Sequence, residues 1–559
     1  MKRLHTDKNN ILLVNITRLG DMLQATPTIA GMKMENPNAR ITVLVEKQFE
    51  EVCHSLPGID EVVSIDLGMT CRALAREQDG IVDAYEYISE LVTKLKAKNF
   101  DYSLNMSSSA YTALLLKVLG VPRFGGWVAD DEGYRIIASD WARLFAASVF
   151  HQNRQFNSLN LVDIFRCSAD VDKHPHQLQF TLNAEALAHA DDILSTAGFT
   201  NSGPIIAVQA GASQDKRQWS RTRLVELVRR LVFDHGARVV MVGTKKELSL
   251  IQPVKDAVDS PNVLIAAGRT SIPQLAALLS KCACLVTGDT GTMHVSVSVG
   301  TPVVALFLAS AFGFETGPYG EGHLVLQPLI GCGPCNPNKP CLGLECHDTI
   351  PTAALADLAI ARSREDFKSL PQDLLPHFDP RQIIVYRSTF DAHGFCELAP
   401  ITSAEHDPLK RYRDAYRQVW LSHLGGFAAN AAPKNNSLII KPHALAQISE
   451  VSELGNGVIS AAQAADEGIE LINNLMRLIS DRSAPSRLLG EVSTKLVQLD
   501  RSIEELGFHI PALGPVTRMM IFAKENLSGS DALGLASQMG SAYRDFKARA
   551  LSLGSYLEQ

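Results

Sequence analysis

Short apolar runs alternate with helical patterns through roughly the first 350 residues of the chain. In the first stretch the strand-like runs are residues 11–15, 41–46, 62–66 and 101–106. In the second stretch they are residues 204–211, 237–243, 263–268, 284–289 and 302–307. Strands that alternate with helices favour parallel sheets with helical crossovers. The pattern predicts two doubly wound α/β domains, residues 1–180 and 181–360.

The pattern changes from about residue 360 onward, where strand-like runs become rare. Residues 437–556 show mainly helical periodicity, as in GIELINNLMRLISDR. The composition of residues 428–437, AANAAPKNNS, is typical of a linker. We therefore expect a connecting region over 361–436 and a helical domain over 437–559.

Composition and charge indicate which broad classes of protein the chain resembles. The 559 residues are 46% hydrophobic and 20% charged, which is ordinary for globular domains. A net charge of −7 gives no general basic field, so nucleic acid is not an expected partner. The apolar run 11–14 is too short for a signal-peptide core, and no stretch approaches the roughly 18 apolar residues of a membrane span. We expect a cytoplasmic protein, in which any contact with the inner membrane is peripheral.

The first predicted strand ends in Asn-Ile-Thr-Arg-Leu-Gly-Asp, which places Asp21 at the carboxyl edge of its sheet. Ligands bind at that edge in open α/β sheets. Asp21 could act as a general base on an acceptor hydroxyl, with Thr17, Arg18 and Gly20 beside it on the acceptor side of the cleft. It could equally cap the helix that follows. Position alone leaves both interpretations open.

A second motif, GDTGTMH over residues 288–294, follows a strand and opens a helix. Free backbone N–H groups at such a helix start, with small residues around them, form a pocket for a diphosphate. Asp289 would then accept hydrogen bonds from a sugar hydroxyl. The alternative is that Asp289 or Thr290 caps the helix and His294 is an ordinary helix residue.

Two further strand ends carry charged residues. Lys216 or Arg217, or both, could neutralise a departing nucleotide diphosphate, although a Lys-Arg pair is usually a solvated surface feature. Glu247 in GTKKE could bind ribose hydroxyls, or it could simply complement the helix dipole.

Four segments, taken in order, resemble a known family. They are NITRLGDMLQATPTI, QAGASQDKRQW, VGTKKE and GDTGTMHVSVSVGTPVVALF, within roughly residues 10–350. This ordered set is similar to glycosyltransferase family 9, the ADP-heptose:lipopolysaccharide heptosyltransferases. The resemblance implies a GT-B architecture, in which residues 1–180 bind the acceptor and residues 181–360 bind the nucleotide sugar across a cleft.

The resemblance also implies residue roles. Asp21 matches the catalytic base, Arg217 the phosphate contact, Glu247 the ribose carboxylate and Asp289 the donor-sugar contact. Thr290, Gly291 and His294 match the surrounding donor loop. The family usually has Lys-x-Trp-Pro where this chain has Arg-Gln-Trp-Ser, so Lys216 stays a second candidate for the phosphate contact. Family members invert the sugar and use no metal at the diphosphate, which predicts no catalytic cofactor here.

Four of the ten cysteines cluster: Cys332, Cys335, Cys341 and Cys346. Thiolates so spaced can surround one tetrahedral zinc or iron ion, and His347 could replace the last of them. Disulfides are the alternative, less favoured in the cytosol. Some family members carry a similar cysteine-rich loop, which implies a structural role rather than a catalytic one.

Other functions stay open beside heptosyl transfer to a lipopolysaccharide core. They are protein glycosylation within the same family, nucleotide-sugar epimerisation, and a non-catalytic scaffold. The exact donor and acceptor are not determined by the sequence. The helical tail could select the acceptor, a partner or an oligomer.

Overall fold

The computed structural model describes residues 8–76, 78–199, 203–341, 343–364, 371, 373–427, 453–481 and 483–558. The chain forms two compact units. The first combines Met1–Gly125 with Leu159–Asp407, and the second combines Gly126–Ser158 with Pro408–Gln559. The expected linker 428–437 lies outside the described residues.

The first half of the first unit is built on a parallel sheet with the strand order β3-β2-β1-β4. The strands are β1 (Asn10–Asn15), β2 (Arg40–Glu46), β3 (Glu61–Ile65) and β4 (Tyr102–Asn105). In register, Ile11 lies between Ile41 and Tyr102. Both neighbours of β1 are parallel, so its side chains are buried on both faces and its sequence is continuously apolar. The four strands predicted from the sequence are confirmed.

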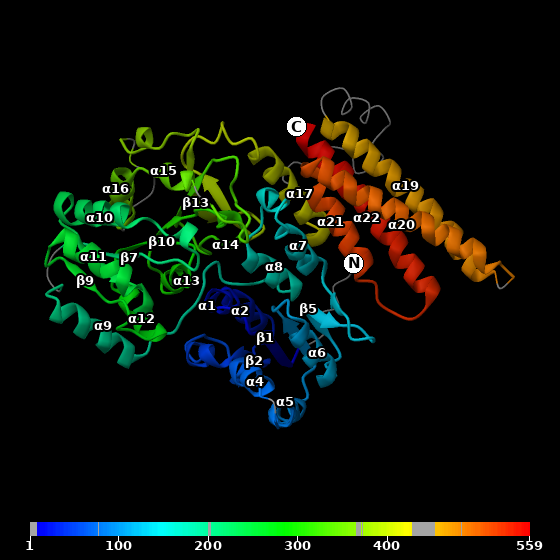
Figure 1. The fold of residues 1–559 in the computed structure, drawn as a ribbon, viewed down its shortest axis with the longest axis horizontal. Coiled ribbons are helices and arrows are strands. Elements are labelled where there is room, and N and C mark those ends of the chain that lie inside the picture. The colour runs from blue at the N-terminus through cyan, green and yellow to red at the C-terminus, as the bar shows by residue number, and fades with distance from the viewer. Residues whose placement is uncertain are drawn as a thin grey trace. The chain divides into compact units, whose positions relative to one another are not determined.

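Helices cover both faces of this sheet (Figure 1). They are α1 (Leu19–Gln24), α2 (Thr26–Glu35), α3 (Glu50–Cys53), α4 (Leu67–Leu74), α5 (Gly80–Lys96), α6 (Ala110–Leu119) and α8 (Leu161–Ser168), with the short helix η1 (Lys47–Phe49). Leu12 and Val14 pack with Leu91 and Leu95 of α5 on one face. Helix α2 packs against α8.

The second half of the first unit contains an eight-stranded sheet, with the order β14-β13-β12-β11-β10-β7-β8-β9. Its strands are β7 (Ile205–Gln209), β8 (Arg238–Val242), β9 (Val263–Ile265), β10 (Cys284–Gly288), β11 (Val303–Leu306), β12 (Leu324–Pro328), β13 (Ile383–Phe390) and β14 (Cys396–Pro400). Strands β7 to β12 are parallel, and β13 and β14 are antiparallel additions at one edge. Residues 361–436 were expected to be only a connecting region, but β13 and β14 extend the sheet there.

Two helical layers enclose this second sheet (Figure 1). The helices are α9 (Ala184–Thr196), α10 (Arg221–Arg229), α11 (Leu248–Val258), α12 (Ile272–Ser280), α13 (Gly291–Ser298), α14 (Gly313–Thr316), α15 (Glu345–Asp348) and α16 (Thr352–Arg362). Short helices are η3 (Asp215–Arg217), η4 (Arg230–Asp234), η5 (Lys245–Glu247) and η6 (Leu375–His377). Apolar side chains of α10, α11 and α16 share one core with the strands. Helices α9 and α13 both pack against α12. Two Rossmann-like domains in one unit match the expected α/β fold of GT-B type.

The second unit is mainly helical, as the periodicity of the tail predicted. The chain enters it within β5 (Phe124–Ala129) and forms β6 (Arg135–Ile137), α7 (Asp140–Ser148) and η2 (Arg154–Phe156). The later helices are α17 (Lys410–Gly425), α19 (Glu453–Ser480), α20 (Ser486–His509), α21 (Gly514–Glu525) and α22 (Ala532–Glu558), with η7 (Pro511–Leu513). Helix α21 packs on α7, and Arg417 donates a hydrogen bond to the backbone oxygen of Ser158 at 2.9 Å. Residues 126–158, assigned by sequence to the N-terminal domain, thus fold with the helical tail.

Within the described ranges, no helix is both long enough and apolar enough to cross a membrane.

Candidate functional site

The loop after β1 holds Asp21 at the carboxyl edge of the first sheet. Helix α1 begins at Leu19, so Asp21 lies in its first turn. The hydroxyl oxygen of Thr17 lies 2.5 Å from Oδ2 of Asp21 and 2.7 Å from Oδ1 of Asn15. The N-cap residue of α1 is Arg18, and no side-chain hydrogen bond caps this helix. Asp21 is therefore not serving as the helix cap, which was the alternative interpretation.

Helix α1 packs against α13 of the second sheet, and glycines permit this close approach. A Cβ atom on Gly20 would lie 2.9 Å from Cδ2 of His294. A Cβ atom on Gly291 would lie 3.2 Å from Cδ2 of Leu19. The loop with Asp21 and the loop that opens α13 thus meet within the first unit, as the sequence analysis required.

His294 is buried at this contact, with 4% of its surface exposed. Burial lowers the pKa of its imidazole to about 4, although the nearby carboxylate of Asp21 acts in the opposite direction. The ring is consequently neutral at neutral pH, and its Nδ1 has no hydrogen-bond partner among the described residues. A neutral ring leaves the negative charge of Asp21 uncompensated by His294.

The loop before α13 leaves the start of that helix accessible to an anion. Thr290 is the N-cap residue but makes no side-chain cap, and its hydroxyl instead lies 3.1 Å from that of Thr287. The carboxylate of Asp289 accepts from Arg217 at 3.1 Å and from Thr316 at 3.2 Å. The backbone N–H groups of the first turn therefore keep the capacity to bind a phosphate.

Arg217 lies in η3, which follows β7 in the chain. Asp289 directly follows β10, the strand next to β7 in the sheet. Their ion pair is partly buried, with exposed side-chain fractions of 17% and 15%. Arg217 Nε also donates to the hydroxyl of Ser310 at 2.8 Å. The guanidinium is thus fixed beside the loop that opens α13.

Lys216 is directed elsewhere. Its ammonium donates to three backbone oxygens of the cysteine-rich loop, those of Asn336 at 2.8 Å, Pro337 at 3.1 Å and Lys339 at 2.8 Å. Three donors meet three acceptors, so its hydrogen-bonding capacity is filled. The structure thereby separates the two adjacent cations that the sequence could not distinguish.

Glu247 lies in front of two glycines at the ends of β7 and β8. A Cβ atom on Gly211 would lie 1.5 Å from its Oε1, and one on Gly243 would lie 2.8 Å from its Oε2. Its carboxylate accepts from Gln209 Nε2 at 2.9 Å and from the Thr244 hydroxyl at 2.8 Å. Glu247 and Thr244 form a capping box, so Glu247 does have a structural role at the start of its helix. The carboxylate remains only partly buried and faces the same strand ends as the other candidate residues.

A small cavity joins several of these groups. Its lining includes Gln209, Gly211, Arg217, Thr287 and Gly288, all at the carboxyl ends of β7 and β10 or in the loops that follow. Thr292 of α13 donates to Oε1 of Gln209 at 3.1 Å. The predicted donor residues therefore converge on one edge of the second sheet.

The cysteine-rich loop lies next to this edge. Cys335 N donates to Ala309 O at 3.0 Å, and His347 Nε2 lies 2.9 Å from the backbone oxygen of Lys216. Burial, together with the neighbouring Cys332 and other thiols of the loop, raises the pKa of Cys335 to about 11. All four cysteines of the loop are free thiols, not disulfides.

The four thiols are not arranged as the ligands of a metal ion. Within the described parts of the chain, no group of three or more His, Cys, Asp or Glu side chains is placed to hold a metal ion. The four thiols belong to one loop, and Cys332, Cys341 and Cys346 all contribute to raising the pKa of Cys335. The predicted metal site thus remains a prediction.

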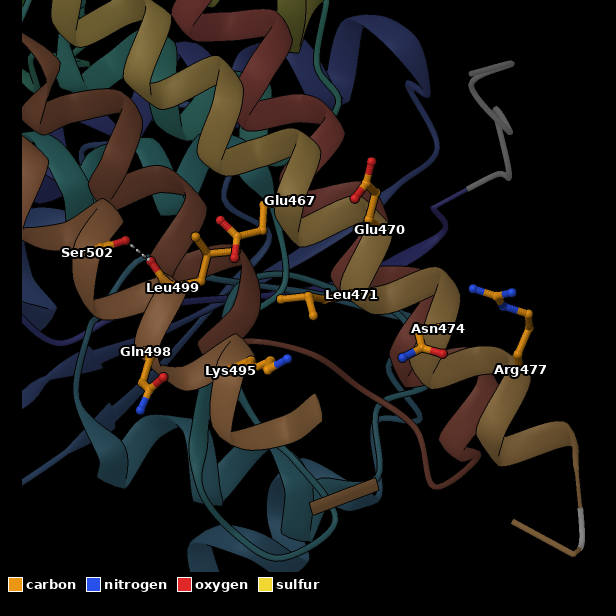
Figure 2. Close-up of a pocket in the computed structure, with 9 residues that line it drawn as sticks. All are labelled: Glu467, Glu470, Leu471, Asn474, Arg477, Lys495, Gln498, Leu499 and Ser502. Atoms are coloured by element: carbon orange, nitrogen blue, oxygen red, sulfur yellow. Dashed lines mark hydrogen bonds between the residues drawn. The ribbon is translucent and has the colours of Figure 1, made fainter. Parts of the chain in front are cut away.

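A separate groove lies in the second unit, between α19 and α20 (Figure 2). Its lining is polar and carries both signs of charge, from Glu467, Glu470, Arg477 and Lys495. None of the residues predicted from the sequence lines this groove.

Comparison with known proteins finds similarity to one family of glycosyltransferases. Residues 88–342 match the model of glycosyltransferase family 9 (heptosyltransferase). The chain is 22% identical over 336 residues to lipopolysaccharide heptosyltransferase 2 of Salmonella typhimurium, covering 57% of this chain and 88% of that protein. This part of the chain is similar to glycosyltransferase family 9.

Solved structures of this family are also similar. The family 9 glycosyl transferase of Veillonella parvula aligns with a TM-score of 0.45 and 20% identity, over 56% of this chain and 85% of that chain. The ADP-heptose heptosyltransferase II of E. coli aligns with a TM-score of 0.45 and 19% identity, over 58% of this chain and 92% of that chain. The match to the family model and the similarity to lipopolysaccharide heptosyltransferases support a glycosyltransferase.

Some residues of this candidate site were not predicted from the sequence. Gln209, Ser310 and Thr316 orient Glu247, Arg217 and Asp289 by hydrogen bonds. Gln209 is the last residue of β7 and lies inside the predicted strand 204–211, which is a weak signal. Ser310 and Thr316 lie in a segment without a motif, so only folding brings them to the site.

Proposed function

We propose that this glycosyltransferase moves a heptose-like sugar from ADP-heptose onto a lipopolysaccharide core or another surface glycan, with inversion at the anomeric carbon. One observation carries the proposal. The loop with Asp21 meets α13 at the contact between Gly20 and His294, so a carboxylate from one domain lies beside the diphosphate-binding helix start of the other.

The reaction would be a single displacement. Asp21 takes the proton of an acceptor hydroxyl as its oxygen bonds to the anomeric carbon. The bond between that carbon and the diphosphate oxygen breaks, and ADP leaves with the electron pair. Holding both reactants on adjacent domains makes the attack effectively intramolecular.

The leaving diphosphate needs positive charge and hydrogen-bond donors. Arg217 supplies the charge, because its guanidinium is held beside the first turn of α13 by Asp289 and Ser310. The uncapped backbone N–H groups of α13, in the loop with Thr290 and Gly291, supply further donors. We assign Lys216 no part in this role, because its ammonium already donates three hydrogen bonds to the cysteine-rich loop.

The rest of the donor would contact the two carboxylates at the ends of the strands. Glu247 accepts hydrogen bonds from the ribose hydroxyls, since its carboxylate is only partly buried at the end of β8. Asp289 accepts from a sugar hydroxyl while Arg217 and Thr316 hold it in place. Thr17, Arg18 and Gly20 border the acceptor side.

The diphosphate requires no metal in this scheme, because Arg217 and α13 provide the charge compensation. A structural zinc or iron ion is proposed instead for Cys332, Cys335, Cys341 and Cys346. Their thiols belong to one loop and are free, which fits a soft four-thiolate site. Such a site would hold the loop that Lys216 also binds.

We further propose that the enzyme works in the cytoplasm, at the periphery of the inner membrane when the acceptor is a glycolipid. The helical second unit lies largely beyond the family match and would serve acceptor choice or oligomer formation.

The test is transfer from ADP-heptose by Asp21→Asn, with ADP affinity measured in parallel. We expect transfer to fall by about 1000-fold or more while ADP binds as in the wild type, because only the base is removed. Asp192→Asn, on the exposed surface of α9, is the matched control and should keep full activity. A wild-type rate for Asp21→Asn would refute the proposed base.

A further inference from the structure

Three side chains form a line at the end of β1. Asn15 is fully buried at the last position of the strand, and Asp21 lies in the first turn of α1. Thr17 bridges them, because its hydroxyl oxygen is 2.7 Å from the Asn15 amide oxygen and 2.5 Å from the Asp21 carboxylate. Ile16 N donates to the Ser107 hydroxyl at 3.0 Å, which fixes the loop between them.

Asn15, Thr17 and Asp21 do not supply enough protons for the hydrogen bonds between them as they are drawn. A threonine hydroxyl has one proton, so it cannot donate to an amide oxygen and to a carboxylate together. At the same time, the amide nitrogen of Asn15 is buried without a hydrogen-bond partner among the described residues. A buried amide donor without a partner is costly.

Turning the Asn15 amide by 180° resolves the proton count and gives the amide nitrogen an acceptor, while the amide oxygen takes the buried position that the nitrogen held. The oxygen and nitrogen of an amide are assigned from the hydrogen-bond network rather than seen directly. With the nitrogen toward Thr17, the amide donates to the hydroxyl oxygen and the hydroxyl donates its proton to Asp21. The weak contact of 3.4 Å from Thr17 N to the amide oxygen is given up.

We propose that Asn15 and Thr17 are positioning residues for Asp21, through a relay of hydrogen bonds from the buried amide to the carboxylate. The proposal rests on the proposed function, in which Asp21 is the base. Asn15 is the buried end of the relay inside the sheet, and Thr17 connects it to Asp21 at the exposed loop after β1. The relay holds Oδ2 of Asp21 and leaves Oδ1 to receive the proton of the acceptor.

The relay matters because an aspartate side chain in a first helical turn can rotate. A general base must stay within about 0.5 Å of its productive position to act efficiently. His294 on the opposite side is neutral and cannot hold the carboxylate by charge. Thr17 is therefore the group that fixes the rotation of Asp21.

The experiment compares Thr17→Val, which keeps the shape but removes the hydroxyl, with Thr17→Ser, which keeps the hydroxyl. We expect Thr17→Val to lower kcat for transfer roughly 10- to 100-fold, with ADP affinity unchanged, and Thr17→Ser to restore most of the rate. Asn15→Leu, which removes the amide, should lower kcat in the same direction. In Asp21→Asn, adding Thr17→Val should change the remaining rate by less than about 2-fold, because the relay acts only through Asp21.

A wild-type kcat for Thr17→Val, or a further large loss in the double variant, would overturn the relay while leaving Asp21 as the base. Wild-type transfer by Asp21→Asn would instead overturn the proposed function. A crystal structure of Thr17→Val gives a reading that needs no substrate. The relay predicts an Asp21 carboxylate in a different or a disordered rotamer there, and an unchanged rotamer contradicts it.

Discussion

Lys216 and Arg217 are adjacent in sequence, yet their side chains bind different parts of the first unit. Lys216 donates to backbone oxygens of the cysteine-rich loop, and Arg217 pairs with Asp289 at 3.1 Å. The short helix η3 produces this divergence, since successive side chains of a helical turn point in different directions. One cation is thereby structural and the other faces the proposed diphosphate.

This divergence predicts opposite phenotypes for the two cations. Arg217→Met should weaken ADP binding by roughly 10- to 100-fold, the range for losing a charge-assisted hydrogen bond. Lys216→Met should leave ADP affinity within about 3-fold but release the loop, so that its cysteines react faster with a maleimide. Calorimetry and timed alkylation measure the two effects. The reverse pattern would show that Lys216 is the phosphate contact.

Gly211→Ala tests the position of Glu247. The added methyl group would lie 1.5 Å from Glu247 Oε1, so the carboxylate must move away from Gln209. We expect the KM for the nucleotide sugar to rise by roughly 10-fold with a smaller change in kcat, because ribose contacts are mainly ground-state binding. Gly490→Ala in α20, where no atom lies within 4 Å of the new Cβ, is the control. An unchanged KM would remove Glu247 from the ribose site.

The buried His294 predicts a stability that depends on pH. Burial is the main cause that lowers the pKa of His294 in the folded protein from 6.5 to about 4. The imidazole is therefore protonated at a higher pH in the unfolded chain than in the folded protein. The contribution is complete above pH 6.5 and is lost as the pH falls toward 4, at roughly 1.4 kcal/mol per pH unit. Partly buried His174 and buried His323, with pKa values lowered to about 4 and about 3, add to this slope.

Denaturant unfolding between pH 7 and pH 4.5 measures the effect, with His294→Gln as the comparison. We expect the glutamine variant to lose less free energy of unfolding over this interval than the wild type. Equal losses in both proteins would mean that the imidazole is not held neutral in the folded state.

A buried ion pair within α8 is hydrogen-bonded to the second half of the first unit. Asp163 accepts from Arg166 at 3.1 Å and from the Tyr319 hydroxyl at 2.9 Å, and its other oxygen accepts from Cys396 N at 2.8 Å. Arg166→Leu would leave the carboxylate buried without its cation, so the unit should lose about 3–5 kcal/mol of stability. Tyr319→Phe removes only a neutral donor and should cost about 1–3 kcal/mol. Equal losses for the two variants would contradict the dominance of the ion pair.

The cysteine-rich loop predicts a metal content near one zinc or iron ion per chain. Cys335→Ser should remove most of this metal and lower the Tm, whereas Cys71→Ser, at an exposed cysteine elsewhere, should keep both. Elemental analysis of the purified protein measures the metal. A wild-type protein without bound metal, in buffers free of chelator, would exclude the proposed site.

Much of the fold follows from local sequence. Strands β1 to β4, β7, β8, β10 and β11 were predicted within two residues and β9 within three, because parallel strands are buried on both faces and read as unbroken apolar runs. The parallel strand β12 was not predicted. Strands β13 and β14 were missed as parts of the second sheet. They are antiparallel edge strands, and their membership depends on pairing with β12, as between Val325 and Tyr386.

The candidate site was predicted in part for a similar reason. Asp21, Glu247 and Asp289 follow strand ends, and the carboxyl ends of parallel strands share one edge of a sheet. The groups that orient them, such as Gln209 and Thr316, were not predicted. Their roles depend on side-chain directions and distances that no spacing rule contains.

By itself, the sequence determined which segments become strands and helices, and which charged residues stand at strand ends, because both depend on residues close together in the chain. Tertiary structure alone decided that Gly20 lies against His294 and that the side chains of Lys216 and Arg217 bind different partners. It also decided that residues 126–158 fold with the helical tail. These features are contacts between residues distant in sequence. Packing and hydrogen bonding select such contacts only once the whole chain has folded.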